Sequence, residues 1–365
     1  MDKMKRMVLL QVPMTICNLQ CHYCYLPKRN NYCRGEQISY RYSPEHVAKA
    51  LSKERLGGCA YINICAAGET LLATDIDKYI YALLKEGHYC EVVSNMTVSK
   101  VLDRICGWDA SLLAHLGFKC SFHFLELKKL NLLDRFAENV NKCWRAGVSI
   151  NIEVTPSDEL IPYIEEVKEF SMKHFGALPL LTIARDDGTE NIVKLTKLSE
   201  EAYRNTWETF NSGFWNFKMT IFGKKREEFC YAGARSIDVD LATGYTAQCY
   251  CTKFSQNIFE DIDKPIVYYP YGKCALPHCF NGHSLLTVGC IPEFCDTTYA
   301  EIRDRVREDG THWLHKEYYD FMSQKLDAEN PVMPQYKERF NDARILAYRA
   351  EKKIAHGFQR ITGRK

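Results

Sequence analysis

Three cysteines near the N-terminus have the spacing of ligands for an iron–sulfur cluster. Cys17, Cys21 and Cys24 lie four and three residues apart, and they follow an apolar run at 8–12 that is predicted to be a strand. Thiolates hold such clusters. Three of them leave one iron of a [4Fe–4S] cube without a protein ligand, and an iron with an open position can bind and activate a small molecule.

Two other interpretations of these cysteines remain open from the residues alone. Structural zinc takes four nitrogen or sulfur ligands, with cysteine pairs two to four residues apart, and His22 could serve as the fourth ligand. The cysteines could also be scattered core residues.

Composition restricts the class of protein. The chain has 365 residues, enough for one large domain and a smaller one, and its net charge of +2 gives no electrostatic signature of nucleic-acid binding. No apolar run is long enough to span a bilayer and no signal peptide is visible, so we expect a cytoplasmic protein without a membrane partner. Seventeen cysteines in such a chain favour metal binding or catalysis over disulfides.

The segment from residue 8 to about 185 alternates β-like runs with helical stretches. This alternation predicts an α/β fold with a parallel sheet, either open or partly closed into a (β/α)6 barrel. Ligands bind at the carboxyl ends of the strands in such barrels, and the three cysteines follow the first strand. The candidate strands are 8–12, 60–65, 90–94, 119–124, 149–155 and 180–183.

A second set of cysteines lies between residues 230 and 295. Cys230 and Cys249 flank Gly244, and this spacing predicts a β-hairpin that turns at Gly244 and brings the two thiols to one site. Cys274 and Cys279, and then Cys290 and Cys295, follow as two pairs with four residues between the members. Zinc is the alternative metal for this site too.

The pattern divides the chain into four predicted regions. We expect a core barrel at 1–185, a helical connector rich in aromatic residues at 186–229, a small cluster-binding domain at 230–295 and a helical tail at 296–365.

The first motif, Cys-x3-Cys-x2-Cys with Tyr23 before the last cysteine, resembles the radical S-adenosylmethionine (radical SAM) superfamily. The resemblance implies a [4Fe–4S] cluster whose open iron binds S-adenosylmethionine (SAM). It also implies reductive cleavage of SAM to a 5′-deoxyadenosyl radical, with a reductant such as flavodoxin or ferredoxin as partner.

The second set of cysteines resembles the SPASM/twitch extension of the same superfamily, which holds auxiliary clusters. We therefore expect one auxiliary [4Fe–4S] cluster on Cys230, Cys249, Cys274 and Cys279. The rest of the SPASM cysteine pattern is not matched. Cys251, Cys290 and Cys295 are then spare, either as buried small hydrophobic residues or as hydrogen-atom donors to a substrate radical.

The resemblance also implies residues that contact SAM. Ala67, Gly68 and Glu69 at the end of the second strand resemble the Gly-Gly-Glu motif that holds the SAM ammonium, with alanine in place of the first glycine. Ser94 and Asn95 end the third strand, where short polar side chains contact a ribose or cap the next helix.

Three further residues have two interpretations each. Glu153 on the fifth strand and Arg185 after the sixth either contact SAM or form salt bridges. His123 on the fourth strand lies between Phe122 and Phe124. It is either a group that points into the barrel or a buried core histidine whose hydrogen bonds are made within the protein.

The residues do not identify the substrate. Only sixteen residues precede Cys17, too few for a leader-binding domain, so we expect a small molecule such as an amino sugar, or a peptide bound without such a domain. Abstraction of hydrogen from an unactivated carbon would lead to oxidation, a cross-link or epimerisation. The alternative class is a zinc- or cluster-binding interaction protein without SAM chemistry.

Overall fold

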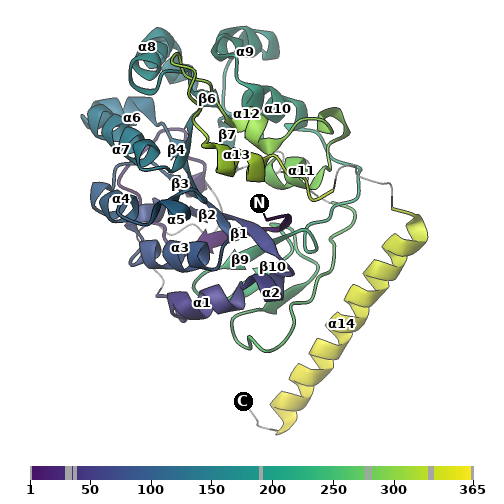
Figure 1. Ribbon diagram of the computed structural model, residues 1–365. Coiled ribbons are helices and arrows are strands. Elements are labelled where there is room, and N and C mark those ends of the chain that lie inside the picture. Colours follow the sequence, from purple (N-terminus) through teal and green to yellow (C-terminus); the bar gives the residue numbers. More distant parts are fainter. Residues whose placement is uncertain are drawn as a thin grey trace.

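A parallel sheet forms the centre of the computed structural model, which describes residues 2–28, 35, 39–188, 192–274, 276, 279, 282–327 and 333–362. Each of its first five strands pairs in parallel with the next one in the sequence. The predicted α/β class with a parallel sheet is therefore confirmed (Figure 1). The strands so paired are β1 (Met4–Val12), β2 (Cys59–Ala66), β3 (Tyr89–Ser94), β4 (Leu116–Ser121), β5 (Ser149–Val154) and β6 (Leu180–Leu181).

Helices connect these strands, as the alternating pattern predicts. They are α1 (Pro44–Ala50), α2 (Lys53–Leu56), α3 (Ile76–Lys85), α4 (Ser99–Cys106), α5 (Ala110–Leu113), α6 (Phe124–Lys129), α7 (Leu133–Arg145) and α8 (Ile164–Phe175), with short 3-10 turns η1 (Leu26–Lys28), η2 (Thr70–Leu72) and η3 (Asp158–Tyr163). The predicted fourth strand, 119–124, lies three residues too far along the chain, because β4 ends at Ser121 and the carbonyl of His123 already accepts the first helical hydrogen bond of α6, from the amide of Leu127.

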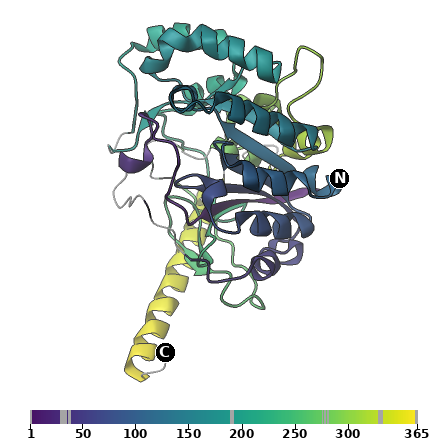
Figure 2. The same cartoon turned by 90° about the vertical axis from the view of Figure 1, so that its left-hand side faces the viewer.

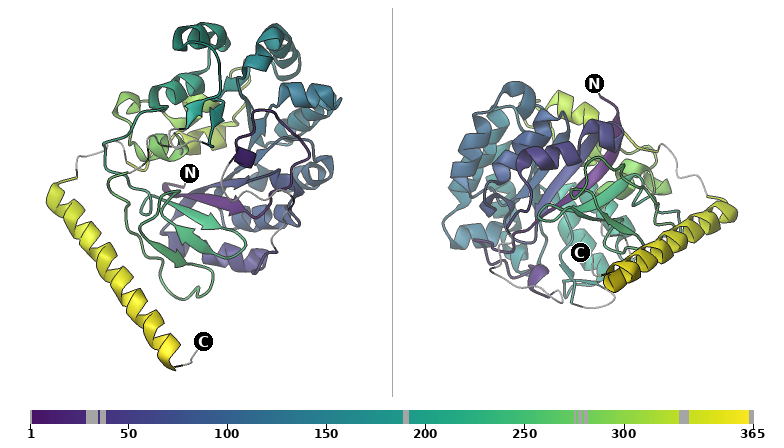
Figure 3. Two further views of the ribbon diagram at one scale, coloured as in Figure 1. Left: turned by 180° about the vertical axis from the view of Figure 1, so that it is seen from behind. Right: turned by 90° about the horizontal axis from the view of Figure 1, so that it is seen from below.

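The sheet continues past β1 into the region of the second cysteine set. Strand β9 (Ser236–Asp240) pairs in parallel with β1, and β10 (Tyr245–Ala247) and β11 (Ser255–Asn257) follow in antiparallel order. The predicted turn at Gly244 is confirmed: its φ is +75°, and a Cβ there would lie 2.4 Å from Cβ of Phe259. Figure 3 shows these strands beside β1, an arrangement that the sequence pattern did not anticipate.

The rest of the described chain is mainly helical. It contains β7 (Arg185–Asp186), β8 (Val193–Lys194), α9 (Glu200–Trp207), η4 (Glu208–Phe210), α10 (Gly213–Ile221), α11 (Gly282–Val288), η5 (Pro292–Phe294), α12 (Tyr299–Arg303), α13 (Lys316–Met322) and α14 (Gln335–Thr362). Figures 1 and 2 show that α14 projects away from the body. None of the helices in the described residues combines the length and the apolar composition needed to cross a bilayer.

Two helical layers enclose the sheet. Figure 1 shows α3, α4 and α7 on one side and α10, α12 and α13 on the other. Tyr318 of α13 packs directly on the sheet, since a Cβ at Gly117 of β4 would lie 2.5 Å from its hydroxyl oxygen. Most aromatic residues of the 186–229 connector, such as Trp207 and Phe214, are buried.

Candidate functional site

The three N-terminal cysteines lie in a loop of residues 13–25, here called the cysteine loop, which leaves the carboxyl end of β1. All three thiols are partly exposed. Burial and the neighbouring Cys17 and Cys24 raise the pKa of Cys21 to about 12, so the three sulfur atoms lie close together. This set of neighbouring thiols fits a cluster held by thiolates. Among the described residues, no three Cys, His, Asp or Glu side chains surround one point as ligands of a single metal ion would.

The turn after β2 packs against the start of the cysteine loop. The amide of Glu69 donates to the carbonyl of Ile16 at 2.9 Å. A Cβ at Gly68 would lie 2.2 Å from the same carbonyl oxygen, so only glycine allows this approach. The turn predicted to hold the SAM ammonium therefore also positions the residue before Cys17.

The side chain of Glu69 points into the protein. Its carboxylate accepts hydrogen bonds from the Ser94 hydroxyl at 2.7 Å and from the amides of Asn95 and Leu71 at 2.8 and 3.0 Å. Burial raises its pKa, although these three hydrogen bonds act in the opposite direction. The carboxylate thus connects the ends of β2 and β3.

The end of β3 is connected to the cysteine loop by a polar network. The amide nitrogen of the Asn95 side chain donates to the side-chain oxygen of Asn18 at 2.8 Å, and the side-chain amide of Asn18 donates to the Thr97 hydroxyl at 2.7 Å. Neither Ser94 nor Asn95 caps the next helix, because α4 has Val98 at its N-cap. Ribose contact by these two residues stays a prediction.

Strands β4 and β5 contribute further contacts to the loop. The Tyr23 hydroxyl is hydrogen-bonded to Nδ1 of His123 at 2.8 Å, and desolvation lowers the pKa of His123 to about 4. After β5, Ser157 is hydrogen-bonded to Nε2 of His22 at 3.0 Å. His22, the candidate fourth zinc ligand, therefore points toward Ser157.

Arg185 and Glu153 both form ion pairs, one of the two roles predicted for them. Arg185, after β6, pairs with Asp187 at 2.8 Å and lies over the ring of Tyr25 at 4.3 Å. The two oxygens of Glu153 lie 3.2 Å from Lys119 and 2.6 Å from Arg303. Burial alone would raise the pKa of Glu153, but the two cations outweigh it and lower the pKa to about 2. Their contact with SAM stays a prediction.

A buried polar network on the inner face of the sheet was missed by sequence reasoning. Glu91 of β3 accepts hydrogen bonds from Tyr61, Asn63 and Asn151 at 2.7, 2.9 and 3.1 Å. Arg303 of α12 joins it by donating to both Asn151 and Glu153. The sequence feature that could have indicated this network is Arg303, a cation beside the apolar residues Tyr299 and Ile302 in the helical tail.

Several cysteines of the second set lie close to one another in the structure. Burial raises the pKa of Cys230 to about 11, with Cys274 and Cys251 as further causes, and burial followed by Cys279 and Cys230 raises that of Cys249. Cys230 thus lies within electrostatic reach of Cys249, Cys251 and Cys274, and Cys249 within reach of Cys279. Their role as ligands stays a prediction.

The remaining spare cysteines differ in exposure. Cys290 is 4% exposed, and burial and then Cys230 raise its pKa. Cys295 is exposed, and its carbonyl accepts a hydrogen bond from Lys325.

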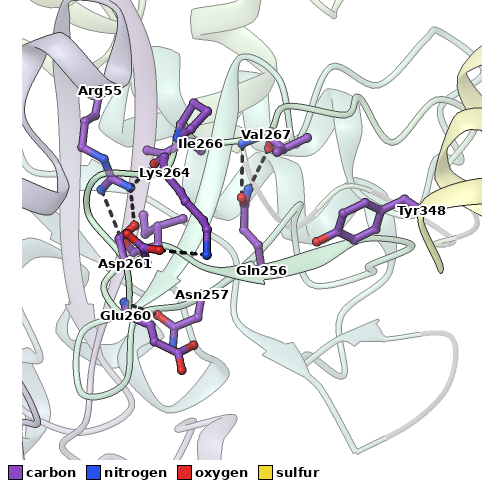
Figure 4. A pocket seen from close by; sticks show the side chains of 11 residues that line it. Arg55, Gln256, Asn257, Glu260, Asp261, Lys264, Ile266, Val267 and Tyr348 are labelled. Atoms are coloured by element: carbon purple, nitrogen blue, oxygen red, sulfur yellow. Dashed lines mark hydrogen bonds and ion pairs between the residues drawn. The ribbon is translucent and has the colours of Figure 1, made fainter. Parts of the chain in front are cut away.

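A separate cavity of about 600 Å³ lies between Arg55, the segment 256–267 and Tyr348 of α14 (Figure 4). The Gln256 side chain bridges to both backbone groups of Val267 there, and Arg55 donates to the carbonyls of Ile258 and Lys264. None of its lining residues is among those predicted to bind SAM or a cluster.

Comparison with known proteins gives one family match and several structural matches. Residues 12–155 match the model of the radical SAM superfamily. No curated protein matches the chain. SuiB of Streptococcus suis bound to S-adenosylmethionine is 15% identical, with a TM-score of 0.47 over 70% of this chain and 64% of that one. The chain thus spans less than two thirds of the length of SuiB.

Two further matches cover nearly the whole chain. Histidine-tagged anSMEcpe with bound AdoMet is 15% identical, with a TM-score of 0.48 over 94% of this chain and 95% of that one. Native anSMEcpe with bound AdoMet and the Cp18Cys peptide is 15% identical, with a TM-score of 0.45 over 94% and 98%.

The family match includes the cysteine loop after β1, the Ala67–Glu69 turn and the ends of β3, β4 and β5. These are the same segments that meet at the carboxyl edge of the sheet. Residues 12–155 of this chain thus match the radical SAM superfamily.

Proposed function

We propose that this protein is an enzyme that cleaves SAM reductively and uses the resulting radical to abstract hydrogen from an unactivated carbon of its substrate. One observation carries the proposal. The cysteine loop, with three neighbouring thiols, is contacted by groups from the ends of all five following parallel strands. A site of this kind has a fixed position at the edge where α/β folds bind ligands.

Cys17, Cys21 and Cys24 would hold the [4Fe–4S] cluster. When bound, such a cluster supplies one electron to SAM, which gives methionine and a 5′-deoxyadenosyl radical. The radical takes a hydrogen atom from a substrate C–H bond, which gives 5′-deoxyadenosine and a substrate radical. The electron comes from an external reductant such as flavodoxin or ferredoxin.

The chain's own groups would position SAM and the loop. Ala67 and Gly68 would contact SAM through their backbone, because the Glu69 carboxylate is used to connect β2 to β3. Tyr23 would be fixed by His123, which the low pKa keeps as a neutral hydrogen-bond partner at neutral pH. We expect His123 to orient the loop rather than to transfer a proton.

An auxiliary [4Fe–4S] cluster on Cys230, Cys249, Cys274 and Cys279 forms the second part of the proposal. It is supported by the mutual effect of these thiols on their pKa values and by the attachment of β9 to β1, the strand from which the cysteine loop leaves. Such a cluster would accept an electron from the substrate radical, giving oxidation or a cross-link. The substrate class stays open between a peptide and a small molecule such as an amino sugar, and the cytoplasmic location stays a prediction.

The test is formation of 5′-deoxyadenosine. Anaerobically reconstituted protein with dithionite and SAM should form it, and the triple variant Cys17→Ala, Cys21→Ala, Cys24→Ala should not. Cys106→Ala is the matched control, because Cys106 is also partly exposed but lies on α4, away from the loop. Product formation by the triple variant would contradict the proposal.

The competing function, a zinc- or cluster-binding interaction protein, gives a different result. Its anaerobically purified sample would be colourless and rich in zinc, or would contain iron without forming 5′-deoxyadenosine.

A further inference from the structure

Positive charge is in excess around Glu153 at the carboxyl end of β5. Lys119 of β4 lies 3.2 Å from one carboxylate oxygen, and Arg303 of α12 lies 2.6 Å from the other. The carboxylate is 8% exposed, and both of its oxygens already have a cationic partner. Each oxygen of Glu153 thus already faces one cation.

Lys218 of α10 is that third cation. Its ammonium lies 5.2 Å from the centre of the Phe214 ring, and Arg303 lies 4.1 Å from the same ring. In the part of the chain that the structure describes, no carboxylate lies within ion-pair distance of Lys218. Burial and the nearby Lys119 lower the pKa of Lys218 to about 7, whereas Glu153 acts in the opposite direction.

The neighbouring carboxylate, Glu91, does not balance the excess positive charge around Glu153. Glu91 is the next carboxylate of this network, and it accepts its hydrogen bonds from Tyr61, Asn63 and Asn151. Even if Glu91 is counted together with Glu153, the three cations outnumber the acids. Arg185, whose charge also lowers the pKa of Lys218, is paired with Asp187. When Lys218 is protonated, the network therefore carries one positive charge that no carboxylate within it balances.

Some of these groups come from outside the segment that matches the superfamily. Glu153 and Lys119 lie toward the carboxyl ends of their strands, the edge to which the cysteine loop also belongs. However, Lys218, Phe214 and Arg303 lie outside residues 12–155, the segment that matches the superfamily. SAM chemistry is shared by the superfamily, whereas the substrate differs among enzymes, so groups from outside the shared domain suit substrate recognition.

We propose that Lys218, with Lys119 beside it, forms a subsite for an anionic group of the substrate, a carboxylate or a phosphate. This inference rests on the proposed function, because it assigns the substrate of that same site. An ammonium and an anion form short charge-assisted hydrogen bonds in such a setting. Lys119 bridges Glu153 and the ligand, while Arg303 holds Glu153 in place.

The test uses full-length holoprotein, with its cluster and SAM bound, labelled with ¹³C-lysine. The resonance of Lys218 is identified by its loss in Lys218→Gln, and inorganic phosphate is the probe. Phosphate should raise the pKa of Lys218 by about 1 to 3 units in the presence of SAM. Its affinity should fall at least about tenfold in Lys218→Gln and be largely kept in Lys218→Arg. Lys316→Gln, at an exposed lysine paired with Asp320, should bind phosphate like the wild type.

Three results would overturn the inference. The first is a pKa of Lys218 that phosphate does not change. The second is equal phosphate affinity in Lys218→Gln, which means adventitious binding. The third is that SAM alone raises the pKa of Lys218 and prevents phosphate from binding. This result would assign the subsite to the SAM carboxylate. Because this readout needs no turnover, it is independent of the 5′-deoxyadenosine assay, and failure of one is distinguishable from failure of the other.

Discussion

Replacement of Gly68 by alanine should displace the cysteine loop. The added Cβ would lie 2.2 Å from the carbonyl oxygen of Ile16 and 2.7 Å from the carbonyl carbons of Ile16 and Thr15. These are backbone atoms, so no side-chain rotation can relieve the overlap. An ordinary contact needs about 3.4 Å or more, and the two segments must therefore separate by roughly 1 Å. Cys17 follows Ile16 directly and must move with it.

The magnitude follows from two contributions. Separation breaks the 2.9 Å hydrogen bond from the amide of Glu69 to the Ile16 carbonyl, which costs about 1 kcal/mol. Overpacking of a buried contact costs a further 1–3 kcal/mol or so. We therefore expect the free energy of unfolding of the cluster-free protein to fall by about 2–4 kcal/mol. Iron bound at the cysteine loop and the rate of 5′-deoxyadenosine formation should fall with it.

Urea unfolding of the cluster-free protein, iron content after reconstitution and 5′-deoxyadenosine formation measure these effects. Gly213→Ala is the matched control, because its Cβ would meet its nearest neighbour at 3.6 Å, an ordinary contact, at the first residue of α10. The reasoning is refuted if Gly68→Ala unfolds at the same urea concentration as Gly213→Ala and binds as much iron.

Three further predictions follow from the cysteines and from His88. Wild-type protein should hold about eight irons per chain and the triple variant of the cysteine loop about half; four irons in the wild type and none in the variant would exclude an auxiliary cluster. If one of Cys251, Cys290 or Cys295 returns hydrogen to the substrate radical, its alanine variant should still form 5′-deoxyadenosine but no longer incorporate deuterium from deuterated water into the product; normal incorporation by all three variants would leave oxidation as the outcome. Burial lowers the pKa of His88 to about 4, so the folded protein should be most stable above pH 6.5, where His88 is neutral in both the folded and the unfolded state. About 3 kcal/mol of the free energy of unfolding should be lost as the pH falls from 6.5 to 4. If His88→Gln unfolds with the same pH dependence as the wild type, another group is responsible.

The cysteine loop and its location could be predicted because both follow from local sequence. The spacing of Cys17, Cys21 and Cys24 lies within eight residues, and the alternation of strands and helices places the end of β1 at the ligand-binding edge. Gly244 is a similar case, since a hairpin turn depends on the residues beside it.

Contacts between distant segments could not be predicted in the same way. Nothing near Ser236 indicates that β9 pairs in parallel with β1, and nothing near Arg303 indicates that it donates to Glu153, 150 residues earlier. The end of β4 was placed three residues too late because Phe122 and Phe124 continue its alternation, although helix α6 begins at Phe124. Tertiary packing decides such cases, and a single sequence does not contain it in a readable form.

The polar residues at the strand ends act mainly on one another. Glu69, Asn95 and Asn18 direct their side chains to the neighbouring turns, so most of their hydrogen-bonding capacity is used before any ligand binds. A rigid frame of this kind fixes the positions of the backbone groups and thiols that remain available, and such preorganisation is what a reactive site requires. Charge that is not compensated within the frame, as at Lys218, then stands out as the part of the site directed at something else.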